Sequence, residues 1–188
     1  MVANLEATVE DLYALPGNRK AEIVNGEIVL MSPTGAAPGY AASEIFVSLR
    51  EYARRIKRGC AVNDNAAFTV DLPNRKSFSP DAAFYVGKWT RVRFFEGAPI
   101  FAVEVRSEGD YGPGAESAIR QKRADYFAAG TLVVWDVNLL SDVVIKSYRV
   151  DSPDVPRIFR GGEIADAEPA LTEWSMRVAD LFYPESRY

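Results

Sequence analysis

The sequence predicts an α/β domain in which a mixed β-sheet is flanked by helices, and three observations lead to this prediction. Patterns typical of helices and strands follow one another in the order helix, hairpin, long helix, three strands, helix and two strands. The run at 99–105 (PIFAVEV) is almost continuously apolar, as expected of a central strand buried on both faces. With 48% hydrophobic and 26% charged residues, the chain has the composition of a soluble globular protein.

The length of 188 residues suits one domain with a sizeable core better than two small ones. We therefore expect a single domain over residues 1–188, with a core at about 21–150 and a C-terminal extension at 151–188. The sequence shows no internal repeat, low-complexity segment or linker that would divide it.

The N-terminal third is predicted to contain two helices separated by a hairpin. Residues 6–15 favour a short helix that stops at a Pro-Gly pair. Residues 22–31 favour a β-hairpin, because an Asn-Gly pair between two apolar runs is a strong signal for a tight type I′ turn. From about 41 to 58 the apolar side chains recur at helical spacing, and the glycine that follows is well suited to end the helix.

The long helix predicted at 41–58 carries a cationic face formed by Arg50, Arg54, Arg55, Lys57 and Arg58. Cations in the last turn of a helix interact favourably with the helix dipole, which is one interpretation of this face. The other interpretation is a surface that contacts the phosphates of a nucleic acid.

The rest of the chain is predicted to be rich in strands. The expected strands are short apolar runs bounded by turn signals, at 60–70, 79–86, 99–105, 131–137 and 142–150. A helix is expected at 115–129, after a glycine-rich loop and before a glycine that ends it. The tail is mixed, with a candidate strand near 157–164 and a short helix near 176–183.

The sequence contains no histidine and a single cysteine, Cys60, and these counts exclude several classes of site. Catalysis by Ser-His-Asp or Cys-His groups, histidine- or thiolate-bound zinc and an internal disulfide are all excluded. A small buried hydrophobe is the ordinary interpretation of Cys60. Any metal must be held by oxygen ligands, which favours Mg²⁺ or Mn²⁺ over softer ions.

The overall properties of the chain favour a cytoplasmic protein without a membrane partner. No apolar run approaches the roughly 18–20 residues that a membrane span needs. The first residues, MVANLEATVEDL, are acidic and lack the cationic and apolar regions of a secretory signal. Because the net charge is −4, a nucleic acid would have to meet a local basic patch.

Two carboxylates stand out because of their positions in the predicted strands. Asp81 lies near the start of one strand, and Glu104 lies inside the apolar central strand, so neighbouring antiparallel strands could bring the two together. Burying a carboxylate among apolar residues is costly unless it is paired or binds a cation. A metal site and a salt bridge are therefore both open for Glu104. The candidate salt-bridge partners are Arg106, Arg120 and Lys122.

Two cations lie near Glu104 in the predicted fold. Lys122 stands at the edge of the apolar face of the helix expected at 115–129. A surface lysine is the ordinary interpretation, but a lysine that points at the end of the sheet could hold and polarise an attacking water. Arg106 projects to the same side of the strand as Glu104. It could take the same role or bind a phosphate bidentately.

Several short motifs follow one another along the chain: Met31-Ser32-Pro33, Pro80-Asp81, Glu104-Val105-Arg106-Ser107, Lys122 with Tyr126, Gly130, and Trp135-Asp136. Their order and spacing resemble the Uma2 family of restriction-endonuclease-like proteins, which shows M-S-P, P-D, E-V-x-S, K-x-x-x-Y, a glycine and W-x-x-D. The resemblance extends from about residue 21 to residue 149. Two positions depart from it, since Tyr40 stands where members often carry a histidine and Glu108 where they often carry a proline. The spacing Trp135-Asp136 is also tight, since some members place one more residue between the two.

The resemblance implies a restriction-endonuclease-like core of the PD-(D/E)xK type, a mixed β-sheet flanked by helices. In that fold an aspartate and a glutamate ligate Mg²⁺ or Mn²⁺, and a lysine positions the hydrolytic water. By position, Asp81 and Glu104 would be the metal ligands and Lys122 the lysine, moved to the following helix. Arg106 occupies the place of the lysine in the unmigrated pattern. Glu22 matches a family glutamate that would complete the metal site.

The activity implied by the resemblance is that of a Mg²⁺-dependent endonuclease that hydrolyses phosphodiester bonds, with DNA as the expected partner. A homodimer is the expected assembly, because duplex DNA has two strands to cut. The alternative is a catalytically inactive member that binds nucleic acid or protein and holds its carboxylates in salt bridges. Hydrolysis of another phosphate ester is a third hypothesis, although the sequence contains no Walker-type or dinucleotide-binding loop.

A loop-like stretch in the middle of the chain interleaves basic and aromatic residues: Lys88, Trp89, Arg91, Arg93, Phe94 and Phe95. Such a mixture suits a surface that contacts nucleic acid or another partner. The aromatic residues of the predicted strands and helices are expected in the core instead.

Overall fold

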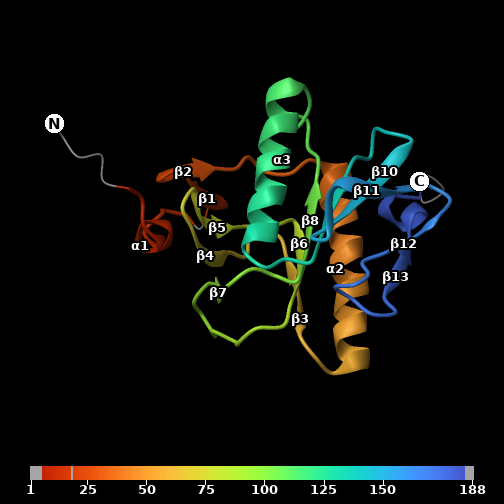
Figure 1. The fold of residues 1–188 in the computed structure, drawn as a ribbon, viewed down its shortest axis with the longest axis horizontal. Helices are drawn as coiled ribbons and strands as arrows, with labels where there is room; N and C mark the ends of the chain where they lie inside the picture. Colours follow the sequence, from red (N-terminus) through yellow and green to blue (C-terminus); the bar gives the residue numbers. More distant parts are fainter. Residues whose placement is uncertain (1–5, 18, 185–188) are drawn as a thin grey trace.

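The computed structural model describes residues 6–17 and 19–184, and its centre is a six-stranded sheet with helices on both faces (Figure 1). The strands of this sheet are β3 (Cys60–Asn63), β6 (Ala82–Tyr85), β8 (Phe101–Val105), β9 (Val133–Val137), β10 (Val143–Arg149) and β11 (Ser152–Arg160). They are arranged in the order β11-β10-β9-β8-β6-β3. Neighbours are antiparallel except for β8 and β9, which are parallel and are connected through helix α3 (Pro113–Ala128). The predicted mixed sheet with the apolar strand β8 at its centre is therefore confirmed.

Different elements cover the two faces of the six-stranded sheet. Helix α2 (Ala36–Ile56) packs on the face that holds Phe101. The opposite face holds Ala102 and packs against Tyr126 of α3. Since successive side chains of a strand point to opposite faces, Glu104 lies on the same face as Ala102, toward α3.

A second sheet of five strands packs beside α3 (Figure 1). Its strands are β1 (Ala21–Val24), β2 (Glu27–Leu30), β4 (Phe68–Leu72), β5 (Arg75–Phe78) and β7 (Phe95–Glu96), in the order β2-β1-β5-β4-β7. Strands β1 and β2 form the predicted hairpin, and its turn residues Asn25 and Gly26 have φ values of 52° and 76°. Positive φ at both positions is what a type I′ turn requires. The short helix α1 (Val9–Tyr13) packs Leu12 against β1.

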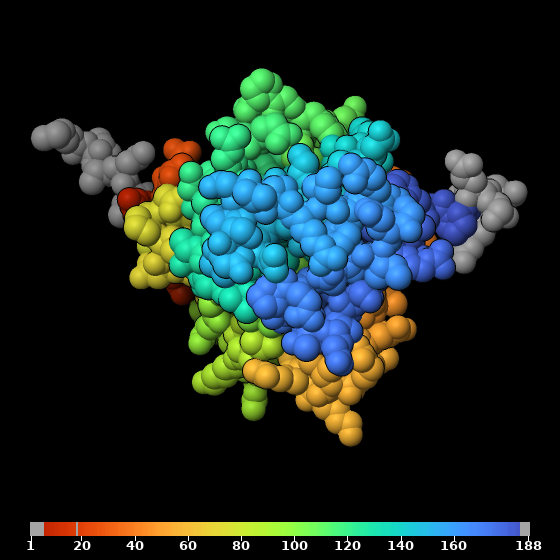
Figure 2. All heavy atoms as spheres, turned by 45° about the vertical axis from the view of Figure 1, so that its right-hand side comes forward, coloured from red at the N-terminus to blue at the C-terminus, as the bar shows by residue number. Residues whose placement is uncertain are grey.

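The C-terminal extension packs into the main core. It contains β11, a small hairpin of β12 (Ile164–Asp166) and β13 (Ser175–Arg177), and the 3-10 helix η1 (Val178–Leu181). The ring of Trp174 lies 5.3 Å from that of Trp135 and 5.5 Å from that of Phe101, centroid to centroid. Figure 2 shows this part of the chain, in blue, spread over the face that is turned forward.

Several boundaries differ from the predicted ones. The run at 60–70 contains two strands rather than one, because a turn that includes Asn65, at a φ of 63°, separates β3 from β4. The candidate strand near 157–164 begins earlier, as β11, and the expected short helix near 176–183 is only the 3-10 helix η1. Among the described residues, no helix is both long and apolar enough to cross a membrane.

Candidate active site

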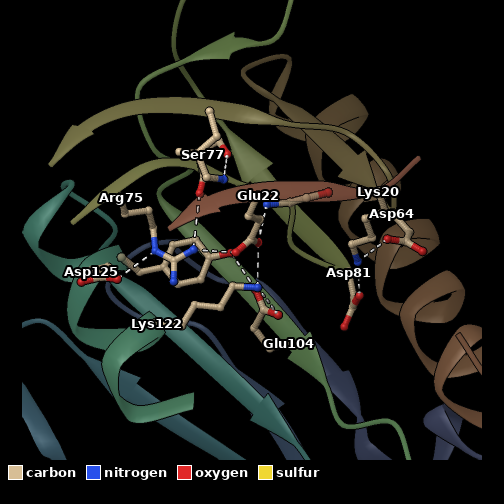
Figure 3. A network of polar contacts seen from close by, with 12 residues as sticks. Lys20, Glu22, Asp64, Arg75, Ser77, Asp81, Glu104, Lys122 and Asp125 are labelled. Carbon is tan, nitrogen blue, oxygen red and sulfur yellow. Dashed lines mark hydrogen bonds and ion pairs between the residues drawn. The ribbon is translucent and has the colours of Figure 1, made fainter. Parts of the chain in front are cut away.

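A cleft of about 600 Å³ lies between α3, the β1–β2 hairpin and the end of β8. The five residues predicted for the site all line this cleft: Glu22, Asp81, Glu104, Arg106 and Lys122. Figure 3 shows four of them, with Glu22 and Lys122 facing one another and Asp81 lying farther along toward α2. The predicted convergence of these residues in one cleft is thus observed.

Asp81 is fixed beside the central strand by backbone hydrogen bonds. Its own N–H donates to the carbonyl of Val103 at 3.0 Å, and its Oδ2 accepts from the N–H of Val105 at 2.8 Å. Glu104 lies between these two residues of β8, so the antiparallel pairing of β6 and β8 brings both carboxylates to one place. The two are near enough that the charge of Asp81 raises the pKa of Glu104.

Glu104 is held from the side of α3. Its Oε2 lies 2.8 Å from Nζ of Lys122, and its Oε1 accepts a hydrogen bond of 2.7 Å from the hydroxyl of Tyr126. Of the three candidate partners, Lys122 makes the salt bridge. Burial raises the pKa of Glu104 to about 7 against the opposing effect of Lys122, and the carboxylates of Asp81 and Glu22 add to the rise.

Glu22 is almost fully buried and is bonded through both of its carboxylate oxygens. Oε1 accepts from the N–H of Ser79 at 2.8 Å and lies 2.9 Å from Nζ of Lys122, while Oε2 lies 2.5 Å from Arg75. Burial opposes its charge, but Lys122 and Arg75 hold the pKa of Glu22 below its usual value. Burial likewise opposes the charge of Lys122, yet Glu104 and Glu22 raise its pKa, so that Lys122 is an ammonium held between two carboxylates.

The family model described as "Uma2: Putative restriction endonuclease" matches residues 9–179. The chain belongs to the Uma2 family. Among curated proteins, no sequence matches this chain.

A solved structure shares the fold. It is the crystal structure of "a putative nuclease belonging to DUF820" from Anabaena variabilis ATCC 29413, with a TM-score of 0.72 and 16% sequence identity. The match covers 94% of this chain and 97% of that chain. At this identity the similarity shows the fold alone, and it confirms the predicted restriction-endonuclease-like class.

Arg106 occupies the variable position of the Uma2 E-V-x-S motif, and its contacts do not favour the catalytic role predicted for it. Nε and Nη2 donate to the two oxygens of Asp136 at 2.7 Å each. The guanidinium also pairs with Glu116 of α3. The donors that would bind a phosphate are therefore engaged by carboxylates. Through these ion pairs, Arg106 connects the end of β8 with β9 and with the start of α3.

The cleft contains two further cations, Arg75 and Lys20, that the Uma2 motifs do not include. Arg75 donates through Nε to Asp125 of α3 at 2.8 Å while it holds Glu22. Lys20 lies 2.7 Å from Asp81 and 2.5 Å from Asp64. The period of two along a strand could have indicated that Lys20 points to the same side as Glu22. The positions of the other partners depend on strand pairing, which no local pattern in the sequence specifies.

The carboxylates of this candidate site suit a hard cation such as Mg²⁺, which keeps part of its shell of water. In the described part of the chain, no three acidic or thiol side chains gather closely enough to enclose a metal ion. Mg²⁺ does not need such an enclosure, because it keeps several waters and is commonly bound by one or two carboxylates. The ion pairs in and beside the cleft involve five carboxylates (Glu22, Asp64, Asp81, Glu104 and Asp125) and three cations (Lys20, Arg75 and Lys122). Fully ionised, these side chains together carry two negative charges in excess, which matches a divalent cation.

Two other predicted surfaces lie outside the set of residues that line this cleft. In the middle loop, Trp89 is exposed, whereas Phe94 stacks on Tyr13 at 4.0 Å. On the cationic face of α2, Arg55 donates to the carbonyl of Glu173 in the C-terminal extension. As contact surfaces for nucleic acid, both stay predictions.

Proposed function

We propose that the protein is a Mg²⁺-dependent endonuclease that hydrolyses phosphodiester bonds in DNA, with Asp81 and Glu104 as metal ligands. The observation that supports this most strongly is the pair of carboxylates on adjacent strands, with the ammonium of Lys122 2.8 Å from Glu104. A carboxylate pair beside a lysine, in a cleft large enough for part of a nucleotide chain, suits hydrolysis of a phosphodiester by water.

In this proposal the side chains around Asp81 and Glu104 have separate roles. A bound Mg²⁺ would polarise a phosphoryl oxygen and neutralise the charge that develops on it. Lys122 keeps its proton and would therefore act as a hydrogen-bond donor that orients the attacking water, rather than as a base. Glu22 fixes the ammonium of Lys122, and Tyr126 fixes the carboxylate of Glu104. A role of Glu22 as a third metal ligand stays a prediction.

DNA is proposed as the substrate because the family description names a restriction endonuclease. Assembly as a homodimer and a cytoplasmic location are proposed together with it, on the grounds given by the sequence. The use of Mn²⁺ in place of Mg²⁺ is compatible with the same oxygen ligands.

The decisive experiment is calorimetric titration of Mg²⁺ and Mn²⁺ into the parent protein and into the Asp81→Asn and Glu104→Gln variants. We expect the parent to bind one divalent ion and each variant to lose that binding. The matched control is Asp71→Asn, which neutralises an exposed carboxylate that pairs with Lys76. Absence of binding in the parent, or binding that neither variant weakens, would contradict the proposed site.

Cleavage of plasmid DNA then tests the role of Lys122. We expect Lys122→Gln to lower the rate by about 100-fold or more, as the removal of a donor aimed at developing charge generally does. Metal binding by this variant should persist, because the ammonium of Lys122 is not a metal ligand and competes with the ion for the carboxylate of Glu104. The Lys76→Gln variant, which removes an exposed lysine, serves as the control and should cleave like the parent.

The ion pairs also favour a second candidate, a catalytically inactive member that binds nucleic acid or protein. Lys20 on Asp81 and Lys122 on Glu104 neutralise the two carboxylates without any metal ion. This candidate predicts no divalent-ion binding, and it predicts that Asp81→Asn changes the free energy of unfolding more than it changes any activity. The same titrations therefore separate the two functions.

A further inference from the structure

A second lysine lies at the proposed metal site, on the side opposite Lys122. Nζ of Lys20 is 2.7 Å from Oδ1 of Asp81, and only 14% of the Lys20 side chain is exposed. Lys20 thus places a cation where a divalent ion would have to bind.

Lys20 differs from Lys122 in having a second partner that faces solvent. Nζ also lies 2.5 Å from Oδ1 of Asp64, a side chain that is 43% exposed. Asp64 and Asp81 both line a second cavity of about 430 Å³, on the side of α2. The ammonium of Lys20 therefore has a hydrated carboxylate available when it leaves Asp81 (Figure 3).

An ammonium and a divalent cation cannot both stay close to the same carboxylate oxygen without strong repulsion. Like charges a few ångströms apart repel even at the effective dielectric constant of a protein surface. Lysine is a compact charge on a flexible stem of four carbons, so a shift away from Asp81 requires rotation of the side chain and no change of the backbone. Lys122 lacks this freedom, because both of its partners, Glu22 and Glu104, belong to the cleft itself.

We propose that Lys20 is an internal competitor of the metal ion at Asp81, and that Asp64 receives its ammonium when a divalent cation binds. The inference rests on the proposed function, because it takes Asp81 as a metal ligand. Lys20 thereby becomes a positioning residue that sets the affinity of the site for Mg²⁺ or Mn²⁺. Asp64 makes the exchange easier by keeping the ammonium paired throughout.

The test is calorimetric titration of Mn²⁺ into the full chain and its variants, with folding checked by circular dichroism. We expect Lys20→Met to bind Mn²⁺ roughly tenfold more tightly, because the competing charge is gone. Lys20→Arg keeps the charge and should bind like the parent. Asp64→Asn should bind more weakly, because Lys20 then has Asp81 as its remaining carboxylate partner among the observed pairs. Lys76→Met, at an exposed Lys–Asp pair of 2.6 Å, is the matched control.

The double variant Lys20→Met/Asp64→Asn distinguishes this role of Asp64 from direct metal ligation. If Asp64 only receives Lys20, its substitution should have little further effect once Lys20 is gone. A metal-ligating Asp64 would instead weaken binding in both backgrounds and overturn the exchange. The inference also fails if Lys20→Met binds Mn²⁺ no more tightly than the parent does. Absence of binding in both the parent and Lys20→Met would overturn the proposed metal site as well, whereas binding that is equal in the two overturns the role of Lys20 alone.

Discussion

Side chains in and beside the cleft hold one another through two sets of ion pairs, Asp64–Lys20–Asp81 and Glu104–Lys122–Glu22–Arg75–Asp125. Each carboxylate contacts a lysine or arginine at 2.5–2.9 Å, and several of these side chains are nearly inaccessible to water. Buried ion pairs seldom raise stability much, because desolvation offsets the attraction, but the loss of one partner is costly. Their main effect here is to fix the orientation of the groups that face the cleft.

Arg106 provides a test of this view at a single residue. The side chains of Arg106 and Asp136 are only 5% and 6% exposed, so removal of Arg106 takes away the salt-bridge partner of buried Asp136, and removal of Asp136 leaves buried Arg106 with Glu116 as its carboxylate partner among the observed pairs. We expect Arg106→Gln and Asp136→Asn each to lower the free energy of unfolding by about 3–5 kcal/mol. The double variant should lose less than the sum of the two, which urea denaturation of all four proteins would measure. If Arg106 were catalytic instead, its substitution would abolish cleavage with stability intact.

Glu104 provides a test through pH. Its pKa in the folded protein is about 7, above the ordinary value of 4.5, so between these values the folded state holds a proton that the unfolded state has released. The resulting stabilisation is fully present below pH 4.5, the pKa of Glu104 in the unfolded chain. It is lost as the pH rises to about 7, the pKa of Glu104 in the folded protein. We therefore expect the parent protein to lose stability relative to Glu104→Gln over this window. A difference between the two unfolding curves that does not vary with pH would contradict the raised pKa.

The sequence allowed the proposed site residues to be predicted better than the side chains that hold them. Asp81, Glu104 and Lys122 could be predicted because each occupies an unusual place in an otherwise apolar strand or helix pattern. Arg75 could not be assigned partners, because they come from β1 and α3, and Lys20 could not, because Asp64 and Asp81 lie next to β3 and β6. All of these contacts join segments far apart in the chain. The role predicted for Arg106 depended on where its side chain points, and its partners Asp136 and Glu116 come from other elements.

Among the elements, the connection from α2 to β3 depends on one glycine. Gly59 has a φ of +70°, and a Cβ there would come within 2.8 Å of the carbonyl oxygen of Tyr85 and 2.6 Å of the ring of Phe84. We expect Gly59→Ala to lower the free energy of unfolding by about 2 kcal/mol or more, from backbone strain and this overlap. Gly162→Ala is the control, since Gly162 has no close neighbour and no strained φ, and it should be neutral or slightly stabilising. Thermal or urea unfolding measures both.

Elements with strong local signals were predicted well, and those without them were missed. The β1–β2 hairpin followed from its Asn-Gly turn, and α2 followed from its helical spacing of apolar residues. Strands β7, β12 and β13 have only two or three residues, which is too short for an alternating pattern to be recognised. The division into two sheets was not expected either, because the order of strands in a sheet is set by contacts between distant segments.

For the whole molecule, we propose that the C-terminal extension and the core fold as one unit. Trp174 is 3% exposed and packs on Trp135 and Phe101 of the central strands. We expect Trp174→Ala to lower the free energy of unfolding by about 3–5 kcal/mol, with a single unfolding transition. Trp89→Ala removes a side chain that is 65% exposed and should cost less than about 1 kcal/mol. Two separate transitions in the parent would contradict a single unit.

The contact of Trp135 with Trp174 also gives the protein a built-in optical reporter. The sequence has three tryptophans, and the third, Trp89, lies in the exposed middle loop. Acrylamide should quench the emission of Trp89 readily and that of the two buried indoles poorly. A Trp89→Phe variant would therefore emit only from the place where the central sheet meets the C-terminal extension.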